Sequence, residues 1–434
     1  MNLKKSLSLV LVSAFGLSVT ACGPQNNFIP EPGVNGDDVT AQASKKADPY
    51  ASLKSGEAIP GEFIVKYKKG AVKKNSLGGE VLKEIGGSKT GMQLVKISAE
   101  SKNALSTFKN DSSVEWAEPN RVIKLELPKV SGTVDSVLKG DQLFNDPMLA
   151  QQYSHKITSA YEGWASLKGK KVETVTVAIV DTGVYTAHPD LKDRIVEGYS
   201  AYPGEKWEDD QQGHGTHCAG IAAAIQDNKE GVAGLATNAK IQPVKVLNDQ
   251  GSGTYAAVAD GIAWAGTHGA KVLSMSLGGP SSSQAIEDAV KVALANDVVV
   301  VAAMGNSGPN AGPSYPAAVK GVMGVAATDS KDAIASFSQT GTHNSVAAPG
   351  VNILSTFPAH PNGIGQQNYG SISGTSMACP YVSGLATLLR GLHPEFTAQQ
   401  VRERIEKTAD DKGAAGYDKV FGNGRVNVAK ALAN

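Results

Sequence analysis

The chain has 434 residues, and its 41 lysine and arginine residues balance 41 aspartate and glutamate residues. A balanced charge offers no basic face for nucleic acid, so we expect no nucleic-acid partner. Hydrophobic residues make up 41% of the chain, which is enough for a substantial core, and the length allows two or three domains. With only three cysteines, the chain is not a disulfide-rich scaffold.

The N-terminus has the features of an export signal. Two lysines precede an apolar run over residues 7–19, which is too short to span a bilayer in a mature protein. The run ends in Val-Thr-Ala-Cys, which resembles a bacterial lipobox, where the cysteine is lipidated and becomes the new N-terminus. We predict a lipoprotein-type signal peptide over residues 1–21 and lipidation of Cys22. A plain secretory signal with an incidental cysteine is the alternative, and both predict export.

Two linkers flank a small N-terminal domain. Residues 22–58 are rich in Pro, Gly, Asn and Asp and predict a flexible tether, and residues 128–145 predict a second linker. Between them, residues 59–127 contain strand-like runs such as Phe-Ile-Val-Lys-Tyr and Met-Gln-Leu-Val-Lys-Ile. We expect helices at residues 81–85 and 101–110. The order strand–helix–strand–helix–strand predicts a small α/β-plait.

From residue 146 to the end, short apolar runs alternate with helical stretches. Continuous Val/Ile runs indicate strands that are covered on both faces, as in parallel sheets flanked by helices. We therefore predict an α/β domain over residues 146–434, with a mostly parallel sheet and helices on both faces. The predicted strands cover residues 176–180, 240–246, 272–275, 298–302 and 324–326, and the predicted helices cover residues 218–226, 255–268, 283–296, 376–392 and 398–408.

Asp181 ends the apolar run Val-Ala-Ile-Val-Asp and is followed by the turn Thr-Gly. In open α/β sheets, binding sites form outside the carboxyl ends of the strands. A carboxylate there can accept a hydrogen bond from an imidazole and fix its tautomer. Taken alone, however, the residue fits a turn or helix-cap aspartate at least as well.

His214 lies in Gly-His-Gly-Thr-His-Cys-Ala-Gly, where a loop opens a helix. One imidazole at this place can serve as a general base. A metal site built on His214, His217 and Cys218 is the rival hypothesis. The segment lacks the glutamate of the zinc-protease motif His-Glu-x-x-His and offers no further ligand nearby. We expect His217 to be a structural partner on the helix.

Ser376 lies in Gly-Thr-Ser-Met-Ala-Cys-Pro at the start of an apolar helix. A serine at this position is most often a helix N-cap. The same position also offers free backbone N–H groups and the positive end of the helix dipole, which favour an oxyanion. Asn306 follows a buried strand and could donate its amide to that oxyanion, although asparagine also suits turns.

Together, these four segments resemble the signature motifs of the subtilisin-like serine proteases (the subtilase, or peptidase S8, family). In that family an acid, a histidine and a serine follow one another in this chain order. The resemblance covers residues 146–434 and implies the subtilisin-like fold. It implies an Asp181–His214–Ser376 triad, with Asn306 in the oxyanion hole. The implied activity is that of a serine endopeptidase (EC 3.4.21), which needs no cofactor for catalysis, and we expect a monomer.

The resemblance also implies where a polypeptide substrate binds. Two glycine-containing segments are similar to the backbone segments between which subtilases hold an extended substrate as an added strand. Met304 and Ser307, with Leu277, imply a specificity pocket without a formal charge and an apolar or broadly tolerant preference. The residues assigned to substrate binding are Gly251, Ser252, Gly253, Ser276, Leu277 and Gly278.

Residues 59–127 resemble the inhibitor-I9-like propeptides of these proteases, which assist folding and block the cleft until they are cut. A folding aid suits a parallel-sheet domain, since high contact order slows folding; an unrelated small binding domain is the alternative. We predict a self-inhibited zymogen that is cleaved within residues 128–145. Because Cys22 precedes the propeptide, cleavage would release the mature enzyme from a membrane-anchored precursor into the periplasm or the extracellular space.

A structural calcium ion is a further expectation. Asp146 and Asp190 resemble ligands of a calcium site in some family members, and the loop around Asp227 is rich in the oxygen ligands that Ca²⁺ prefers. Lys229 is an unfavourable neighbour for a cation. Cys218 and Cys379 are expected to be free buried thiols, with a disulfide between them as the alternative.

Two other functions fit parts of the pattern. A catalytically silent cell-envelope binding protein of the same fold would lack a member of the triad, and none is missing. An esterase would carry Gly-x-Ser-x-Gly with the acid between the serine and the histidine, and neither feature is present. For the protease, activity is expected to rise with pH as His214 loses its proton, because only a neutral imidazole acts as a base.

Overall fold

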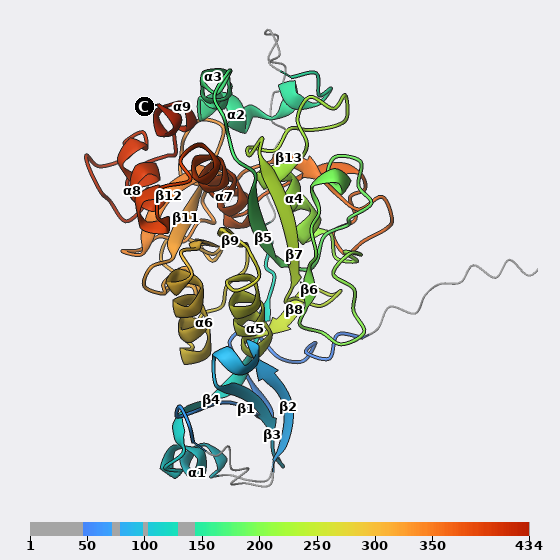
Figure 1. The fold of residues 1–434 in the computed structure, drawn as a ribbon, viewed down its shortest axis with the longest axis vertical. Coiled ribbons are helices and arrows are strands. Elements are labelled where there is room, and N and C mark those ends of the chain that lie inside the picture. The colour runs from blue at the N-terminus through green and yellow to red at the C-terminus, as the bar shows by residue number, and fades with distance from the viewer. Residues whose placement is uncertain (1–46, 72–78, 99–102, 129–143, 434) are drawn as a thin grey trace, which may run out of the picture. The chain divides into compact units, whose positions relative to one another are not determined.

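A computed structural model describes most of the N-terminal domain and nearly all of the domain that follows it (Figure 1). The predicted signal peptide and Cys22 lie outside the described residues, as do most of the tether and most of the second linker. Within the part of the chain that is described, no helix is both long and apolar enough to cross a membrane. The described residues are 47–71, 79–98, 103–128 and 144–433.

The N-terminal domain is an antiparallel sheet with helix α1 packed against it (Figure 1). The strand order is β2–β3–β1–β4, and Phe108 of α1 packs on Phe63 with ring centroids 5.8 Å apart. The elements are β1 (Ala58–Tyr67), β2 (Glu80–Ile85), the short 3₁₀ helix η1 (Gly87–Lys89), β3 (Met92–Lys96), α1 (Ala104–Asn110) and β4 (Val114–Lys124).

Residues 81–85, which were expected to be helical, form strand β2 instead. Val81 lies opposite Val95 of β3, and Ile85 lies opposite Met92. A helix of one or two turns is unstable alone, because few hydrogen bonds offset its nucleation. Pairing with β3 satisfies the same backbone groups and buries Ile85 completely. Helix α1 falls within the range predicted for the second helix.

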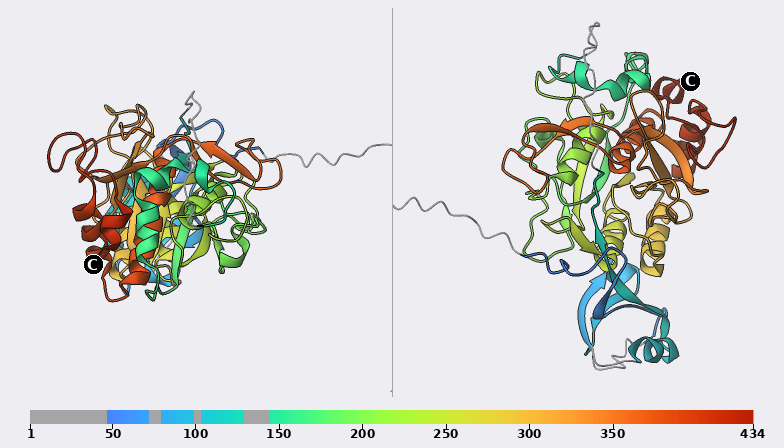
Figure 2. Two further views of the ribbon diagram at one scale, coloured as in Figure 1. Left: turned by 90° about the horizontal axis from the view of Figure 1, so that it is seen from above. Right: turned by 180° about the vertical axis from the view of Figure 1, so that it is seen from behind.

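The second domain is built on a parallel sheet with the strand order β12–β11–β10–β9–β5–β7–β6 (Figures 1 and 2). All strand pairs within this sheet are parallel. This confirms the predicted α/β fold. The strands are β5 (Val175–Asp181), β6 (Tyr199–Ser200), β7 (Ala239–Lys245), β9 (Val272–Met275), β10 (Val299–Ala303), β11 (Met323–Thr328) and β12 (Asn344–Pro349).

Helices cover both faces of this sheet, and successive strand residues alternate between the two faces, as a pleated strand requires. Val177 and Ile179 of β5 pack in a core with α4 and α7, whereas Ala178 and Val180 pack in a second core with α5 and α6. The remaining elements are η2 (Leu149–Gln151), α2 (Tyr153–Ile157), α3 (Ala160–Ser166), η3 (Lys192–Arg194), α4 (His214–Ala223), β8 (Ser252–Thr254), α5 (Tyr255–Ala265), α6 (Gln284–Ala295), β13 (Ile353–Thr356), β14 (Tyr369–Ile372), α7 (Thr375–Leu392), α8 (Ala398–Thr408) and α9 (Val428–Leu432).

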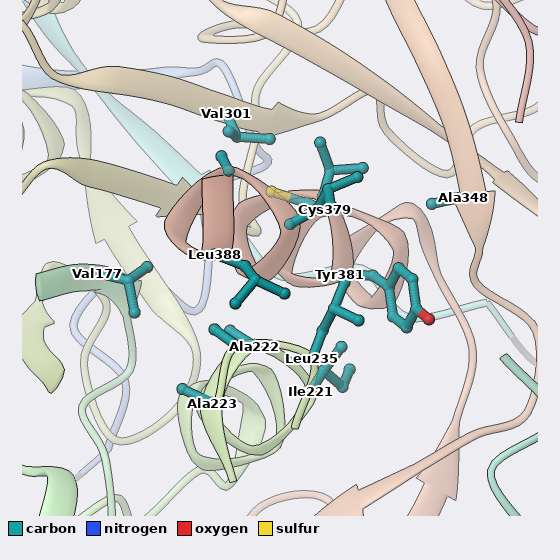
Figure 3. Packing of buried hydrophobic residues seen from close by; sticks show 14 of the residues in the cluster. Val177, Ile221, Ala222, Ala223, Leu235, Val301, Ala348, Cys379, Tyr381 and Leu388 are labelled. Atoms are coloured by element: carbon teal, nitrogen blue, oxygen red, sulfur yellow. The ribbon is translucent and has the colours of Figure 1, made fainter. Parts of the chain in front are cut away.

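Helix α7 lies between the sheet and α4, and Figure 3 shows its side chains from close by. Every residue of α7 except Leu392 is buried. Leu388 points toward α4, where Ala222 and Ala223 face it, and Cys379 points toward Val301 of the sheet (Figure 3). A helix that is buried on all sides requires such a core. This packing fixes the first turn of α7, which carries Ser376.

The N-terminal sheet continues into the second domain through a β-strand pairing. Strand β4 pairs antiparallel with β8, with Val122 opposite Thr254 and Lys124 opposite Ser252. The predicted tether also ends earlier than expected, because residues 48–57 already make hydrogen bonds to both domains.

Candidate active site

Asp181 and His214 meet where strand β5 ends and helix α4 begins. His214 Nδ1 lies 2.8 Å from Oδ1 and 3.0 Å from Oδ2 of Asp181, and both side chains are fully buried. Because a carboxylate only accepts hydrogen bonds, Nδ1 carries the proton and Nε2 is the basic nitrogen. Among the described residues, Nε2 has no hydrogen-bond partner. It is therefore free to accept a proton from a nucleophile.

Two glycines of the motifs allow this close approach. Gly183 has a φ of 104°, in the left-handed region that favours glycine. A Cβ atom on Gly215 would lie 2.1 Å from the carbonyl oxygen of Gly183. Any side chain at Gly215 would therefore push α4 away from the end of β5.

Asp210 anchors the start of α4, and the sequence analysis did not identify it. Its Oδ1 accepts a hydrogen bond from Thr182 Oγ1 at 2.8 Å, and its Oδ2 accepts one from the Thr216 amide at 2.9 Å. Thr182 Oγ1 in turn accepts from the Gly215 amide at 2.9 Å. A carboxylate at a helix N-terminus also complements the dipole. Asp210 thus positions His214, and an acid just ahead of a helix start was the available signal.

Ser376 lies in the first turn of α7. Its Oγ donates a hydrogen bond to the carbonyl oxygen of Ser276 at 3.2 Å and not to His214. The hydrogen bond between a nucleophile and its general base is often made only once a substrate is bound. If Ser376 is the predicted nucleophile, its hydroxyl would have to leave the Ser276 carbonyl and donate to His214 Nε2.

Pro380 leaves the carbonyl of Ser376 without its helical partner, because proline has no N–H to donate four residues back. That carbonyl instead accepts hydrogen bonds from Ser276 Oγ at 2.8 Å and from Cys218 Sγ at 3.5 Å. These bonds hold the first turn of α7 against the end of β9 and against α4. Pro380 and Ser276 together fix the backbone that carries the Ser376 hydroxyl.

The side-chain amide of Asn306 is a hydrogen-bond donor held beside Thr375, the residue before Ser376. Its Oδ1 accepts hydrogen bonds from the backbone N–H and the Oγ1 of Thr375, both at 2.9 Å, which fixes the orientation of the amide. That Thr375 orients the Asn306 amide was not predicted from the sequence. Asn306 Nδ2 donates to the carbonyl oxygen of Glu126 at 2.9 Å. A carbonyl from the end of the N-terminal domain therefore occupies the position toward which this donor points.

A cavity of about 720 Å³ opens beside Ser376. The segment 124–126 lines it, and so do Ser276, Leu277 and Gly278. Every residue that the second domain contributes to its lining is uncharged. Ser307 also lines the cavity, whereas Met304 does not: it is fully buried in the core beside α5 and α6.

The other predicted substrate segment, residues 251–253, does not line this cavity but binds the end of the N-terminal domain. Ser252 and Gly253 belong to β8, which pairs with β4, and the carbonyl of Gly251 accepts a hydrogen bond from the Leu125 amide at 3.0 Å. A peptide segment is therefore already bound here as an added strand, which is how an extended substrate binds a sheet edge.

The geometry does not suit a zinc ion. The ligand atoms that converge within the described residues are those of Asp181, His214 and Cys218, and His214 Nδ1 is already bonded to Asp181. Burial raises the pKa of the Cys218 thiol well above its usual range, so the thiolate that a metal needs is disfavoured. His217 bonds to a backbone carbonyl, and burial lowers its pKa to about 3. Cys218 and Cys379 are both buried and free.

The three predicted calcium ligands lie around one loop. Asp146 is fully buried and accepts a hydrogen bond from the Asp227 amide at 3.0 Å, and the buried Asp190 accepts one from the side chain of Asn228 at 2.8 Å. Burial raises the pKa of Asp146, and the charge of Asp190 adds to this shift. Oxygen donors and buried negative charge fit Ca²⁺ chemically. Among the described residues, however, these three carboxylates do not converge as closely as Asp181, His214 and Cys218 do.

The fold and the site define a serine peptidase built on a parallel α/β sheet. A model described as the subtilase family matches residues 173–424, and one described as the fervidolysin N-terminal prodomain matches residues 44–120. The chain belongs to the subtilase family, and the protein is a subtilisin-like serine peptidase with an N-terminal prodomain.

Two similar proteins match over nearly their whole length. Subtilisin DY from Bacillus licheniformis is 45% identical over 267 residues, which cover 61% of this chain and 93% of that protein. Thermitase from Thermoactinomyces vulgaris is 43% identical over 289 residues, which cover 66% of this chain and 98% of that protein.

A solved structure also resembles both domains. The crystal structure of fervidolysin from Fervidobacterium pennivorans, described as a keratinolytic enzyme related to subtilisin, matches with a TM-score of 0.76 and 28% identity. The match covers 88% of this chain but 62% of that one, so the chain spans less than two thirds of fervidolysin.

Proposed function

We propose that the protein is an exported serine endopeptidase that is made as a self-inhibited precursor and matured by removal of its prodomain. One observation carries this proposal: the carbonyl oxygen of Glu126 lies 2.9 Å from Asn306 Nδ2, beside a cavity that Ser376 lines. A carbonyl placed next to a nucleophile and an aimed donor has the position of a scissile carbonyl. The end of the prodomain thus occupies the site as a substrate would, and blocks it.

The catalytic steps use the four side chains in separate roles. Ser376 Oγ attacks the peptide carbonyl carbon while His214 Nε2 takes its proton, and Asp181 holds the tautomer and stabilises the imidazolium. The Asn306 amide and the Ser376 backbone N–H donate to the oxyanion. The intermediate collapses, the C–N bond breaks, and the leaving amine takes the proton from His214. Water then hydrolyses the acyl-enzyme by the same steps and restores Ser376.

The substrate is an extended polypeptide. We propose that residues 251–253 and 276–278 hold it from two sides, since the first segment already pairs with β4 and the second lines the cavity. Uncharged walls favour apolar or varied side chains before the scissile bond. Catalysis needs no cofactor.

Maturation cleaves the bond between Glu126 and Leu127, which lies just before the linker 128–145 in which cleavage is expected from the sequence. The hydrogen bond between the Leu125 amide and Gly251 sets the register that brings the Glu126 carbonyl to Asn306. The Glu126 side chain is exposed, so its carboxylate stays hydrated beside uncharged walls.

The prodomain acts as an I9-like inhibitor and folding aid. Glu118 accepts hydrogen bonds from the amides of Gln284 and Ala285 at the start of α6, at 2.9 and 3.0 Å. Asn120 accepts one from the Ala256 amide at the start of α5, at 3.1 Å. Backbone N–H groups at helix starts have no partner within the helix. The prodomain supplies partners for two helices that cover the sheet.

The precursor is anchored through a lipid on Cys22, and the mature enzyme is released to the periplasm or the extracellular space. The order of the chain supports this, because cleavage after Glu126 separates Cys22 from the whole catalytic domain. A calcium ion held by Asp146, Asp190 and Asp227 would stabilise the loop around residue 227 and take no part in the chemistry.

The test is Ser376→Ala in the full chain. We expect loss of both peptide hydrolysis and prodomain removal, whereas Ser383→Ala, a buried serine further along α7, should retain both. A Ser376→Ala precursor that still hydrolyses peptides would refute the mechanism. The alternative, a catalytically silent binding protein of this fold, predicts that an organophosphonate forms no adduct at Ser376 in correctly processed protein.

A further inference from the structure

The prodomain reaches the active site with two segments, only one of which is the cleaved end. The second segment, here called the strap, comprises residues 48–57 and precedes strand β1. It was expected to be part of a flexible tether. In the structure its residues 51–55 line the same cavity as Ser376 and Asn306.

The first end of the strap is bonded to β8 and to the loop before it. Asp48 Oδ2 accepts a hydrogen bond from Ser252 Oγ at 2.8 Å, and Asp48 Oδ1 accepts one from Asn248 Nδ2 at 3.2 Å. Both partners are almost fully buried. Hydrogen bonds to an ionised carboxylate are among the stronger ones in proteins. This end is therefore fixed to one of the proposed substrate-binding segments.

The other end of the strap is bonded to the prodomain and packs beside Pro280, which lines the cavity. The Gly56 amide donates to the Val122 carbonyl at 2.8 Å, and the Val122 amide donates to the Glu57 carbonyl at 2.9 Å. Gly56 has a φ of 86°, and a Cβ atom there would lie 2.8 Å from the side chain of Pro280. Strand β4 thus pairs with β8 on one edge and with the strap on the other.

We propose that the strap is a second inhibitory segment, which keeps the cavity beside Ser376 closed after the bond at Glu126 is cut. The proposal rests on the proposed function and concerns how the same site is regulated. Cleavage frees only the chain that follows Glu126. The strap lies on the other side of the prodomain in sequence, and within the described part of the chain none of its hydrogen bonds involves Glu126 or Leu127. Release of the strap is therefore a further requirement, after the cut, before substrate can enter the cavity.

The test compares the time course of cutting with that of activity in the full chain. The precursor is held at mildly acidic pH and is then shifted to about pH 8, where a histidine can act as a general base. Cutting is followed on gels, and activity with a fluorogenic peptide. Asp48→Ala removes both carboxylate contacts, so we expect the lag between cutting and activity to shorten at least tenfold. Gly56→Val, which collides with Pro280, should act in the same direction, and the rate of cutting should not change.

Glu80→Ala provides the matched control, because Glu80 is an exposed prodomain acid on β2, away from the strap. Its lag should equal that of the unaltered chain. Equal lags for Asp48→Ala, Gly56→Val and Glu80→Ala would overturn the proposal. A chain that is never cut and never active would instead count against the proposed function.

A second measurement applies even if a strap variant does not fold. In the Ser376→Ala full chain, hydrogen exchange should show residues 50–57 protected to a degree similar to residues 122–126, because Gly56 and Val122 share hydrogen bonds. Exchange of the strap at the rate of a free chain, with residues 122–126 protected, would contradict the proposal.

Discussion

The two domains differ in where their apolar surfaces are buried. The catalytic domain has cores of its own on both faces of its sheet. The prodomain sheet buries one face, with Val65 and Val95, under its own helix, whereas Ile64 and Met92 on the other face are buried in the core of α5 and α6. One face of the prodomain sheet therefore depends on the catalytic domain for its burial, whereas the catalytic domain supplies most of both of its cores. This asymmetry suits an inhibitor that must be discarded.

The largest expected effect lies in the catalytic domain. Asn306→Ala removes the side-chain donor that faces the Glu126 carbonyl, and losing one such donor typically lowers kcat by about 10²–10³-fold. Steady-state kinetics on a peptide substrate provide the measurement. A kcat within a factor of two of the unaltered enzyme would show that Asn306 does not stabilise the oxyanion.

The comparison between the two prodomain faces can be tested by a pair of truncations. Ile64→Ala removes a fully buried side chain from the shared core and should weaken the cut prodomain complex by about 2–5 kcal/mol. Val95→Ala, in the prodomain's own core, should lower the thermal stability of the prodomain and weaken the complex less. Dissociation of the two cut fragments is measured by size exclusion. Equal weakening by the two variants would remove the distinction between the faces.

A smaller effect on the stability of the cut complex is expected for Glu118, which accepts hydrogen bonds at the start of α6. Glu118→Gln keeps the shape of the side chain but removes the charge at the start of α6, so we expect complex stability to fall by about 1–2 kcal/mol. Glu115→Gln on the same strand, whose side chain contacts Lys66 and not a helix start, is the control. The dissociation rates of the cut complexes are the readout, and identical rates would contradict the capping role.

Acid should also release the prodomain. Asp288 of α6 faces Lys66 and Trp116 of the prodomain and Lys291 of its own helix. Burial raises the pKa of Asp288, but hydrogen bonds from Lys291 and Lys66 outweigh burial and leave it below its usual value. A lowered pKa in the complex means that this stabilisation is present above the ordinary carboxyl range and is lost as pH falls through the lowered pKa.

We therefore expect the cut complex to dissociate several-fold faster below about pH 4, and Asp288→Asn to reduce that pH dependence. Burial lowers the pKa of Lys66, but hydrogen bonds to Asp288 and Glu115 outweigh burial and raise that pKa. The stabilisation from the charge of Lys66 is therefore lost only as pH rises through the raised pKa. An unchanged acid profile in Asp288→Asn would exclude this pair as the cause.

Candidate site residues could be predicted from the sequence where each belongs to a short local motif. Asp181 and His214 each belong to a short signature, and the structure places their side chains 2.8 Å apart. Strand β12, in contrast, was not predicted, because Asn-Ser-Val-Ala-Ala-Pro has few β-branched residues and is a strand only through its pairing with β11.

Contacts between distant segments could not be predicted. The hydrogen bond between Glu126 and Asn306 joins residues that are 180 positions apart, and no pattern around either residue indicates it. The strap was assigned to a linker because its composition, with Pro, Ser and Gly, is that of a loop. Composition describes local preference, whereas the bonds of Asp48 to Ser252 and Asn248 depend on the tertiary fold.

The central claim is that the end of the prodomain lies in the active site as a substrate, with Glu126 at the scissile bond. N-terminal sequencing and intact mass of the enzyme matured from the full chain test it most directly. We predict a mature N-terminus at Leu127, no acyl group, and slowed processing in Leu127→Pro but not in Leu138→Pro. A first cut at another bond, or a mature catalytic domain that still carries the lipid, would contradict the account.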